Sequence, residues 1–143
     1  MTEKTLVEPL GYQLVQVCKA HRNKAVSLLA PIGLHPGQEL ILSHLGNEDG
    51  QTQSELVDLS CVQPATMTKS LDRLANAGLV QRRSDSEDSR VSRIYLTVKG
   101  RSIQQKIEQV WQEMEAISFG ALTDEERATL RRLLLKVREN LTR

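Results

Sequence analysis

The segment from Gln63 to Thr97 restricts the fold of this chain more than any other part of its sequence. A helix is predicted from Pro64, a residue suited to a first helical turn, to the region of Gly78, because apolar residues recur between them at helical spacing. Two short β-compatible stretches, 79–83 and 93–97, follow with a polar connection between them, which is typical of a hairpin. A helix followed at once by a charged hairpin predicts a winged helix-turn-helix.

A second helix is expected immediately before that one. Thr52 and Glu55 have the spacing of a capping box, in which each side chain accepts a hydrogen bond from the other residue's backbone N–H. The short helix that they open would end at a break around 60–62. Helix, tight turn and helix form a helix-turn-helix. The second helix of such a motif enters the major groove of DNA, and the hairpin, or wing, reaches the backbone or the minor groove beside it.

The rest of the chain is predicted to be helical. Aromatic residues make up only 3% of it, so packing must depend on Leu, Val, Ile and Ala, which favours helices over a β-sandwich. Apolar residues recur at helical spacing in four further segments: about 9–30, 36–45, 100–116 and 123–141. The expected fold class is mainly α with a small β-hairpin wing (α+β), a winged helix-turn-helix with six helices.

The two ends of the chain hold more helix than a small winged domain needs. We expect a single domain over residues 1–143, with the winged helix-turn-helix lobe at about 34–100 and dimerisation helices at about 1–33 and 101–143. Amphipathic helices with more apolar surface than one small core can use find a partner. A symmetric homodimer would place two recognition helices about one DNA turn apart, where they would read a palindrome.

The charge of the chain is concentrated in its winged part. Residues 63–101 carry eight Lys or Arg and four Asp or Glu, a net +4, which leaves −3 for the rest of a chain whose net charge is +1. A local basic surface on a nearly neutral protein suits contact with double-stranded DNA through one face.

Several classes of protein are disfavoured by the sequence. It contains no apolar run long enough to span a bilayer and no secretory signal, so we expect a cytoplasmic protein with no membrane partner. It also contains no Gly-rich phosphate loop, nucleophile elbow or HExxH motif, and we expect neither an enzyme nor a cofactor. Its three histidines are scattered without an i, i+4 pair, so no metal site is expected.

The candidate DNA-contact residues lie on the polar side of the second helix of the motif and on the wing. They are Gln63, Pro64, Ala65, Thr66, Thr68, Lys69, Arg73, Asp88, Arg90 and Arg93. Gln63 could pair bidentately with adenine, and Lys69 and Arg73 could reach guanine or phosphate. The alternative is that the helical residues only form the solvated face of an amphipathic helix.

Arg90 is the most specific of these candidates. At the tip of a hairpin, its guanidinium could enter a narrow A·T-rich minor groove, where the potential is most negative. Asp88, two residues before it, could hold Arg90 or brace the wing against Arg73 or Arg93. The alternative is a mobile loop, and the three carboxylates of the loop favour it, since they would repel phosphates unless paired.

An ordered set of short motifs identifies a family. In chain order they are Ser54-Glu55-Leu56, Pro64-Ala65-Thr66-Met67-Thr68-Lys69, Leu71-Asp72-Arg73-Leu74, Gly78-Leu79-Val80, Asp88-x-Arg90, Leu96-Thr97-x-x-Gly100 and Leu122-Thr123-x-Glu125-Glu126. With them the chain resembles the MarR family of bacterial and archaeal transcription regulators. The resemblance implies a triangular helical dimer with two winged lobes, usually a repressor released by a ligand or by oxidation. It also implies that Arg90 enters the minor groove and that the helix from Pro64 reads the major groove.

The sequence indicates less about the signal to which such a regulator responds than about its DNA contacts. Members of the family commonly bind small aromatic or phenolic acids between the dimer base and the winged lobe. The candidate effector-binding residues here are Tyr12, His21, Arg22, His44 and Trp111. His21 and His44 could titrate near neutral pH or bind an anion, or they could be ordinary, partly buried helix residues.

The two cysteines permit a redox hypothesis. Some relatives sense organic hydroperoxides with a cysteine on the first helix, and Cys18 is the candidate here, although it is out of register with that position. Cys61 lies near a helix N-terminus, which can lower the pKa of a thiol. Cysteine is among the most buried residue types, which argues against both. A different class of function, a winged helix used for protein–protein contact, stays open, because fold alone does not decide function.

Overall fold

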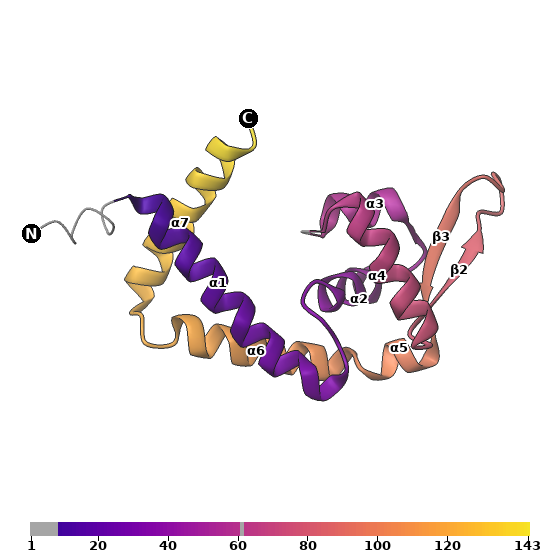
Figure 1. Cartoon of the computed structure of the whole chain (residues 1–143), viewed down its shortest axis with the longest axis horizontal. Helices are drawn as coiled ribbons and strands as arrows, with labels where there is room; N and C mark the ends of the chain where they lie inside the picture. Colours follow the sequence, from indigo (N-terminus) through magenta and orange to yellow (C-terminus); the bar gives the residue numbers. More distant parts are fainter. Residues whose placement is uncertain (1–8, 61) are drawn as a thin grey trace, which may run out of the picture. The chain divides into compact units, whose positions relative to one another are not determined.

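A computed structural model describes residues 9–60 and 62–143, so the redox hypothesis for Cys61 lies outside the described residues. The elements, in chain order, are α1 (Leu10–Leu29), the 3-10 turn η2 (Ala30–Ile32), α2 (Gln38–Asn47), β1 (Gln51–Thr52), α3 (Gln53–Leu59), α4 (Pro64–Asn76), β2 (Val80–Ser84), β3 (Ser92–Leu96), α5 (Val98–Ser102), α6 (Gln104–Phe119) and α7 (Asp124–Leu141) (Figure 1). The expected fold class is confirmed.

The chain divides into two compact units within α6. The first runs up to Val110 and contains the helix-turn-helix and the wing, and the second is Trp111–Arg143. The bounds expected for the winged lobe and for the dimerisation helices stay a prediction.

The core of the first unit is made of apolar side chains, including those on the inner faces of the helix-turn-helix. Its fully buried side chains are Leu29, Ile41, Leu42, Leu45, Leu56, Met67, Leu71, Leu74, Ile94 and Ile107. They come from α1, α2, α3, α4, β3 and α6, and each contributes on the order of 1.5–3 kcal/mol by leaving water. Because α4 buries one apolar row in this core, its opposite row is turned to solvent.

The sheet has three strands in the order β1-β3-β2, and both pairings are antiparallel. Val80 pairs with Leu96 at the base of the wing and Ser84 with Ser92 near its tip, as the hairpin pattern predicts. The sequence did not indicate β1, because two residues are too few to show an alternation. This strand joins the wing to the turn that follows α2.

Two helices begin or end differently from the sequence prediction. Pro36 precedes α2, which begins at Gln38 after Gly37 adopts a φ of 98°. The single helix expected after Gly100 is two helices: α5 begins at Val98, and α6 follows a break at Ile103. The earlier start is explained by Thr97, whose Oγ1 accepts a hydrogen bond from the Gly100 backbone N–H at 3.0 Å.

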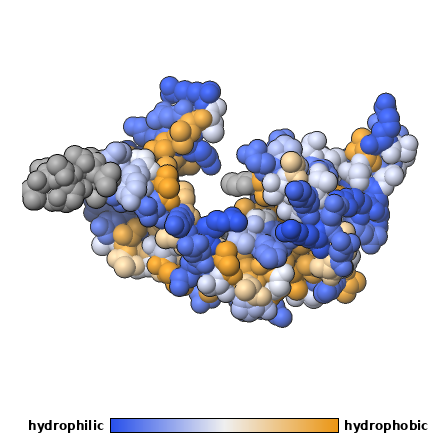
Figure 2. Space-filling view, in the orientation of Figure 1, coloured by the Kyte–Doolittle hydropathy of each residue, from blue (hydrophilic) through white to orange (hydrophobic). Residues whose placement is uncertain are grey.

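The second unit holds the end of α6 and all of α7. A capping box opens α7: Thr123 Oγ1 accepts from the Glu126 N–H at 3.1 Å, and the Thr123 N–H donates to Glu126 Oε1 at 2.9 Å. No residue of α7 is buried in the single chain, although its apolar residues recur at helical spacing. Figure 2 shows apolar side chains at the surface of this helix. None of the helices that the structure describes is long and apolar enough to cross a bilayer.

Candidate nucleic-acid interface

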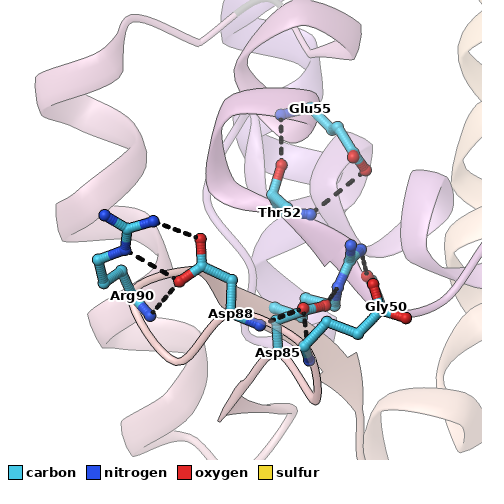
Figure 3. A network of polar contacts seen from close by, with 8 residues as sticks. Gly50, Thr52, Glu55, Asp85, Asp88 and Arg90 are labelled. Atoms are coloured by element: carbon cyan, nitrogen blue, oxygen red, sulfur yellow. Dashed lines mark hydrogen bonds and ion pairs between the residues drawn. The ribbon is translucent and has the colours of Figure 1, made fainter.

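The first helix of the motif is fixed at its start. The capping box predicted at Thr52 is present: Thr52 Oγ1 accepts from the Glu55 N–H at 3.1 Å, and the Thr52 N–H donates to Glu55 Oε2 at 3.3 Å (Figure 3). The buried side chain of Gln51 donates to the backbone carbonyls of His44 and Glu48, at 3.0 and 2.8 Å. The start of α3 is thereby tied to the end of α2.

The predicted α4 residues all lie on one exposed surface. Gln63, Pro64, Ala65, Thr66, Thr68, Lys69 and Arg73 are exposed, whereas Met67, Leu71 and Leu74 are buried on the reverse of the helix. Gln63 is the N-cap and Pro64 the first helical residue, and the Gln63 side chain makes no capping hydrogen bond among the described residues. Its amide is therefore available to an external partner.

One residue of this surface was not recognised from the sequence. Gln53, the first residue of α3, donates from Nε2 to Thr68 Oγ1 at 2.8 Å. A hydroxyl that accepts a hydrogen bond on one side can direct its own proton elsewhere, here toward solvent. The two residues are 15 positions apart and no local pattern relates them, so only the packing of α3 against α4 reveals the pair.

The positive charge of α4 is not neutralised by its own carboxylate. Asp72 pairs with Arg82 of β2 at 2.8 Å. Lys69 and Arg73 are exposed and make no ion pair within the residues that the structure describes. The exposed surface of α4 therefore offers two cations and several hydroxyl and amide groups, the chemistry that contacts phosphates and base edges.

The wing loop is ordered by one carboxylate. Asp85 Oδ2 accepts from the N–H groups of Glu87 and Asp88, each at 3.0 Å (Figure 3). Its other oxygen, Oδ1, accepts from Arg93 Nε at 2.5 Å. The Arg93 hydrogen bond, with those two backbone N–H groups, lowers the pKa of the Asp85 carboxyl. The loop is also closed by backbone hydrogen bonds from Asp85 N–H to the Val91 carbonyl at 2.8 Å and from Val91 N–H to the Asp88 carbonyl at 3.0 Å.

Arg90 extends from the tip of this loop. Its side chain is 89% exposed and pairs with Asp88 through two parallel hydrogen bonds, Nε to Oδ1 at 3.0 Å and Nη2 to Oδ2 at 3.1 Å. The Arg90 side chain, and then its backbone N–H, lower the pKa of the Asp88 carboxyl. Of the partners considered for Asp88, the structure selects Arg90.

The carboxylates of the wing loop would repel DNA phosphates unless they were paired, and two of the three are paired with arginines of the same hairpin. Asp85 and Asp88 both accept hydrogen bonds from arginine, and of the three loop carboxylates only Glu87 makes no ion pair within the described residues. The wing tip is hydrophilic at its surface (Figure 2).

Arg93 differs from the other candidates. It is half-buried, and besides its bond to Asp85 it donates from Nη1 to the backbone carbonyl of Gly50 at 2.9 Å. Its contacts here are internal to the chain, and a contact with DNA stays a prediction.

The candidate effector residues are spread over three helices. Tyr12, His21 and Arg22 are exposed on α1, His44 is half-buried on α2, and Trp111 is half-buried at the start of the second unit. No interaction among these five is found in the described residues, and their role stays a prediction.

A buried carboxylate near His21 was not anticipated. Burial raises the pKa of Glu39 on α2, while a hydrogen bond from the Gly37 N–H at 2.7 Å and the charge of His21 act against this rise. Cys18 is exposed on α1, contrary to the usual burial of cysteine, and its redox role stays untested. No cluster of three metal-binding side chains occurs within residues 9–60 and 62–143.

Comparison with known proteins gives a consistent result. Residues 34–92 match the model of the MarR family. The HTH-type transcriptional repressor Rv2887 of Mycobacterium tuberculosis is 30% identical over 129 residues, which are 90% of this chain and 93% of that protein.

Two solved structures resemble the chain along most of its length. A mutant of E. coli MarR in complex with operator DNA superposes with a TM-score of 0.83 at 28% identity, covering 94% of this chain and 96% of that one. BpsR of Bordetella bronchiseptica, whose DNA binding is regulated by 6-hydroxynicotinic acid, has a TM-score of 0.85 at 22% identity over 91% of this chain and 93% of that one, a likeness of fold alone. From the family match, the repressor and the DNA-bound structure together, this chain belongs to the MarR family of DNA-binding transcription regulators and is not an enzyme.

Proposed function

We propose that this regulator is a homodimeric repressor that binds a palindromic operator and is released by a small molecule or a stress signal. The observation that carries the proposal is the exposed polar surface of α4, together with Arg90 extended from the wing. Two cations of that surface, Lys69 and Arg73, make no ion pair among the described residues. In this proposal α4 lies in a major groove, and Gln63, Pro64, Ala65, Thr66, Thr68, Lys69 and Arg73 contact bases and phosphates. Gln53 is added as the partner that orients Thr68.

In the proposed complex Arg90 enters the adjacent minor groove. Its guanidinium keeps Nη1 free of the hydrogen bonds to Asp88, so the pairing orients the side chain and leaves donors for DNA. Minor-groove arginines favour narrow A·T tracts because the potential is most negative there. We therefore expect A·T-rich flanks outside each half-site.

Dimerisation is supported by exposed apolar side chains on the two terminal helices. On α1, Leu10, Val15 and Val17 are 84%, 62% and 62% exposed. On α7 no residue is buried, and in the second unit four apolar residues, Phe119, Leu130, Leu134 and Leu135, line a groove together with the charged residues Glu115, Arg127, Arg131 and Arg138. Surfaces of this kind mark protein–protein contacts, and a second copy of the chain is the partner that a palindromic operator requires.

Release by an effector is proposed from the side chains of five residues on α1, α2 and α6. Tyr12, His21, Arg22, His44 and Trp111 supply aromatic, cationic and titratable side chains, which suit a small aromatic or phenolic acid. Regulation of DNA binding by such an acid is a property of BpsR, with which this chain shares a fold. As a regulator of transcription, the protein is proposed to act in the cytoplasm.

The decisive experiment is selection of bound sequences from a random duplex pool by the purified full-length protein. An enriched palindrome with half-sites about one helical turn apart is expected. If a verified dimer enriches no sequence at low salt, the operator proposal fails, and a winged helix used for protein–protein contact becomes the better account. The recovered operator then serves for screening aromatic acids as releasing effectors.

A further inference from the structure

We propose that Arg93 and Asp85 are positioning residues that fix the wing to the turn between α2 and β1, and that they affect DNA binding only through Arg90. The inference rests on the proposed function, since it assumes that the wing touches DNA. It reassigns Arg93 from the predicted DNA contacts.

The guanidinium of Arg93 connects two parts of the chain that are distant in sequence. Nε donates to Asp85 in the wing loop, and Nη1 donates to the carbonyl of Gly50, 43 positions away. Only the planar fork of arginine can hold both acceptors in one fixed geometry. A lysine would keep the positive charge, but its single ammonium group lacks the planar set of donors that reaches both acceptors.

Asp85 uses its two oxygens for different tasks. Oδ1 accepts from Arg93, and Oδ2 accepts from the backbone N–H groups of Glu87 and Asp88. Asp88 in turn holds the Arg90 guanidinium at the tip. A continuous series of hydrogen bonds therefore runs from Gly50 through Arg93, Asp85 and Asp88 to Arg90. Figure 3 labels Gly50, Asp85, Asp88 and Arg90 along this series.

The turn at the other end of this series is itself well anchored. Asp49 accepts from the Leu96 N–H at 2.9 Å and pairs with Arg101 of α5 at 2.6 Å. Gly50 has a φ of 73°, and a side chain there would overlap the ring of Tyr95. Because this turn is held by β3 and α5, it provides a fixed reference for the wing.

The first test is a double-mutant cycle on operator DNA with Arg93→Lys and Arg90→Ala. Alone, Arg93→Lys is expected to weaken binding on the order of tenfold, because the fork to Asp85 and Gly50 is lost. In the Arg90→Ala background, the same change is expected to cost less than about twofold. If Arg93 contacted a phosphate directly, Arg93→Lys would cost little affinity, because lysine also binds phosphate as a point charge. Any loss would then be the same in the Arg90→Ala background, because the effects of separate contacts add.

The second test asks whether removing a negative charge from the wing strengthens or weakens DNA binding. Asp85→Asn removes a negative charge from the wing, and by electrostatics alone it would strengthen DNA binding. An asparagine has only one acceptor oxygen and cannot serve both Arg93 and the loop N–H groups, so positioning predicts weaker binding. Glu87→Gln is the matched control, because it makes the same charge change in the same loop and Glu87 makes no side-chain hydrogen bond in the described residues. Its affinity is expected to stay equal or to rise.

Hydrogen exchange of the free protein gives a readout that is independent of DNA. In Asp85→Asn, the amides of Glu87 and Asp88 are expected to exchange faster, while the core amides of α4 keep their protection. Tighter binding by Asp85→Asn, or additive losses in the cycle, would overturn the inference. An unchanged affinity of Arg90→Ala would overturn the wing contact of the proposed function instead, and exchange at Glu87 and Asp88 would still decide whether the wing is held as proposed.

Discussion

At the scale of single residues, the wing shows how a loop rich in carboxylates can serve a DNA-binding protein. Two of its three acidic side chains are occupied as hydrogen-bond acceptors, Asp85 within the loop and Asp88 on Arg90. Their negative charge is matched by arginines of the same hairpin. The Asp88–Arg90 pair is exposed, and such pairs contribute little to stability, so its value is in geometry.

Replacing Arg90 by alanine is expected to weaken operator binding by roughly 1–3 kcal/mol and to lower the salt dependence by about one unit, the effect of losing one minor-groove cation. Fluorescence anisotropy across a salt series measures both quantities. Dimerisation should be unchanged, because Arg90 is 89% exposed at the wing tip. An affinity equal to that of the native protein at every salt concentration would refute the wing contact.

The order of the wing loop should persist in mild acid. The pKa of Asp85 is lowered in the folded chain, so its contribution to stability is full above the ordinary value, about 3.9, and is lost as pH falls through the lower folded value. NMR signals of the Glu87 and Asp88 amides should therefore stay constant from neutral pH to about pH 4 and shift only below it. A titration midpoint above about pH 4 would contradict the Asp85–Arg93 pairing.

At the scale of elements, α4 separates stability from recognition by its two faces. Met67, Leu71 and Leu74 are buried against the core, and Lys69 and Arg73 on the other side are exposed. The same 13 residues therefore serve both purposes without conflict. The helix leads directly into β2 of the wing, and β1, next to α3, pairs with β3.

Substitutions on the two faces of α4 should have opposite consequences. Leu71→Ala is expected to lower the free energy of unfolding by about 2–5 kcal/mol, because it opens a cavity at a fully buried position. Lys69→Ala should change stability by less than about 0.5 kcal/mol yet weaken DNA binding. Chemical denaturation and operator titration of both variants test the pair. A loss of stability in Lys69→Ala would mean that the exposed face of α4 is not free.

At the scale of the whole molecule, the chain leaves apolar surface that a monomer does not use. The helix α7 has 18 residues and none of them is buried, although Leu133, Leu134, Leu135 and Val137 line it. In the proposed homodimer, a second copy of the chain would bury these side chains.

Removing residues 123–143 is expected to give a monomeric or aggregated protein, since the exposed leucines of α7 would no longer be available for a partner. Light scattering of the purified truncated chain measures the outcome. The substitution Thr142→Ala, at the C-cap of α7, is a suitable control and should leave the dimer intact. A stable dimer after the truncation would refute an interface through α7.

The sequence by itself determined those features whose causes are local. The spacing of apolar residues identified α4, the pair Thr52–Glu55 identified the start of α3, and the polar stretch after Ser84 identified the wing. Each depends on residues a few positions apart, where propensity and capping act directly.

Only the tertiary structure decided which charged groups pair and where short elements form. Arg93 meets Gly50 across 43 positions and Arg101 meets Asp49 across 52, and no spacing rule selects such partners. The two-residue strand β1 and the break at Ile103 are likewise products of packing. The physical reason is that these contacts form only after the core has brought distant segments together, so the choice between Asp85 and Asp88 as the partner of Arg93 is made by geometry and not by local sequence.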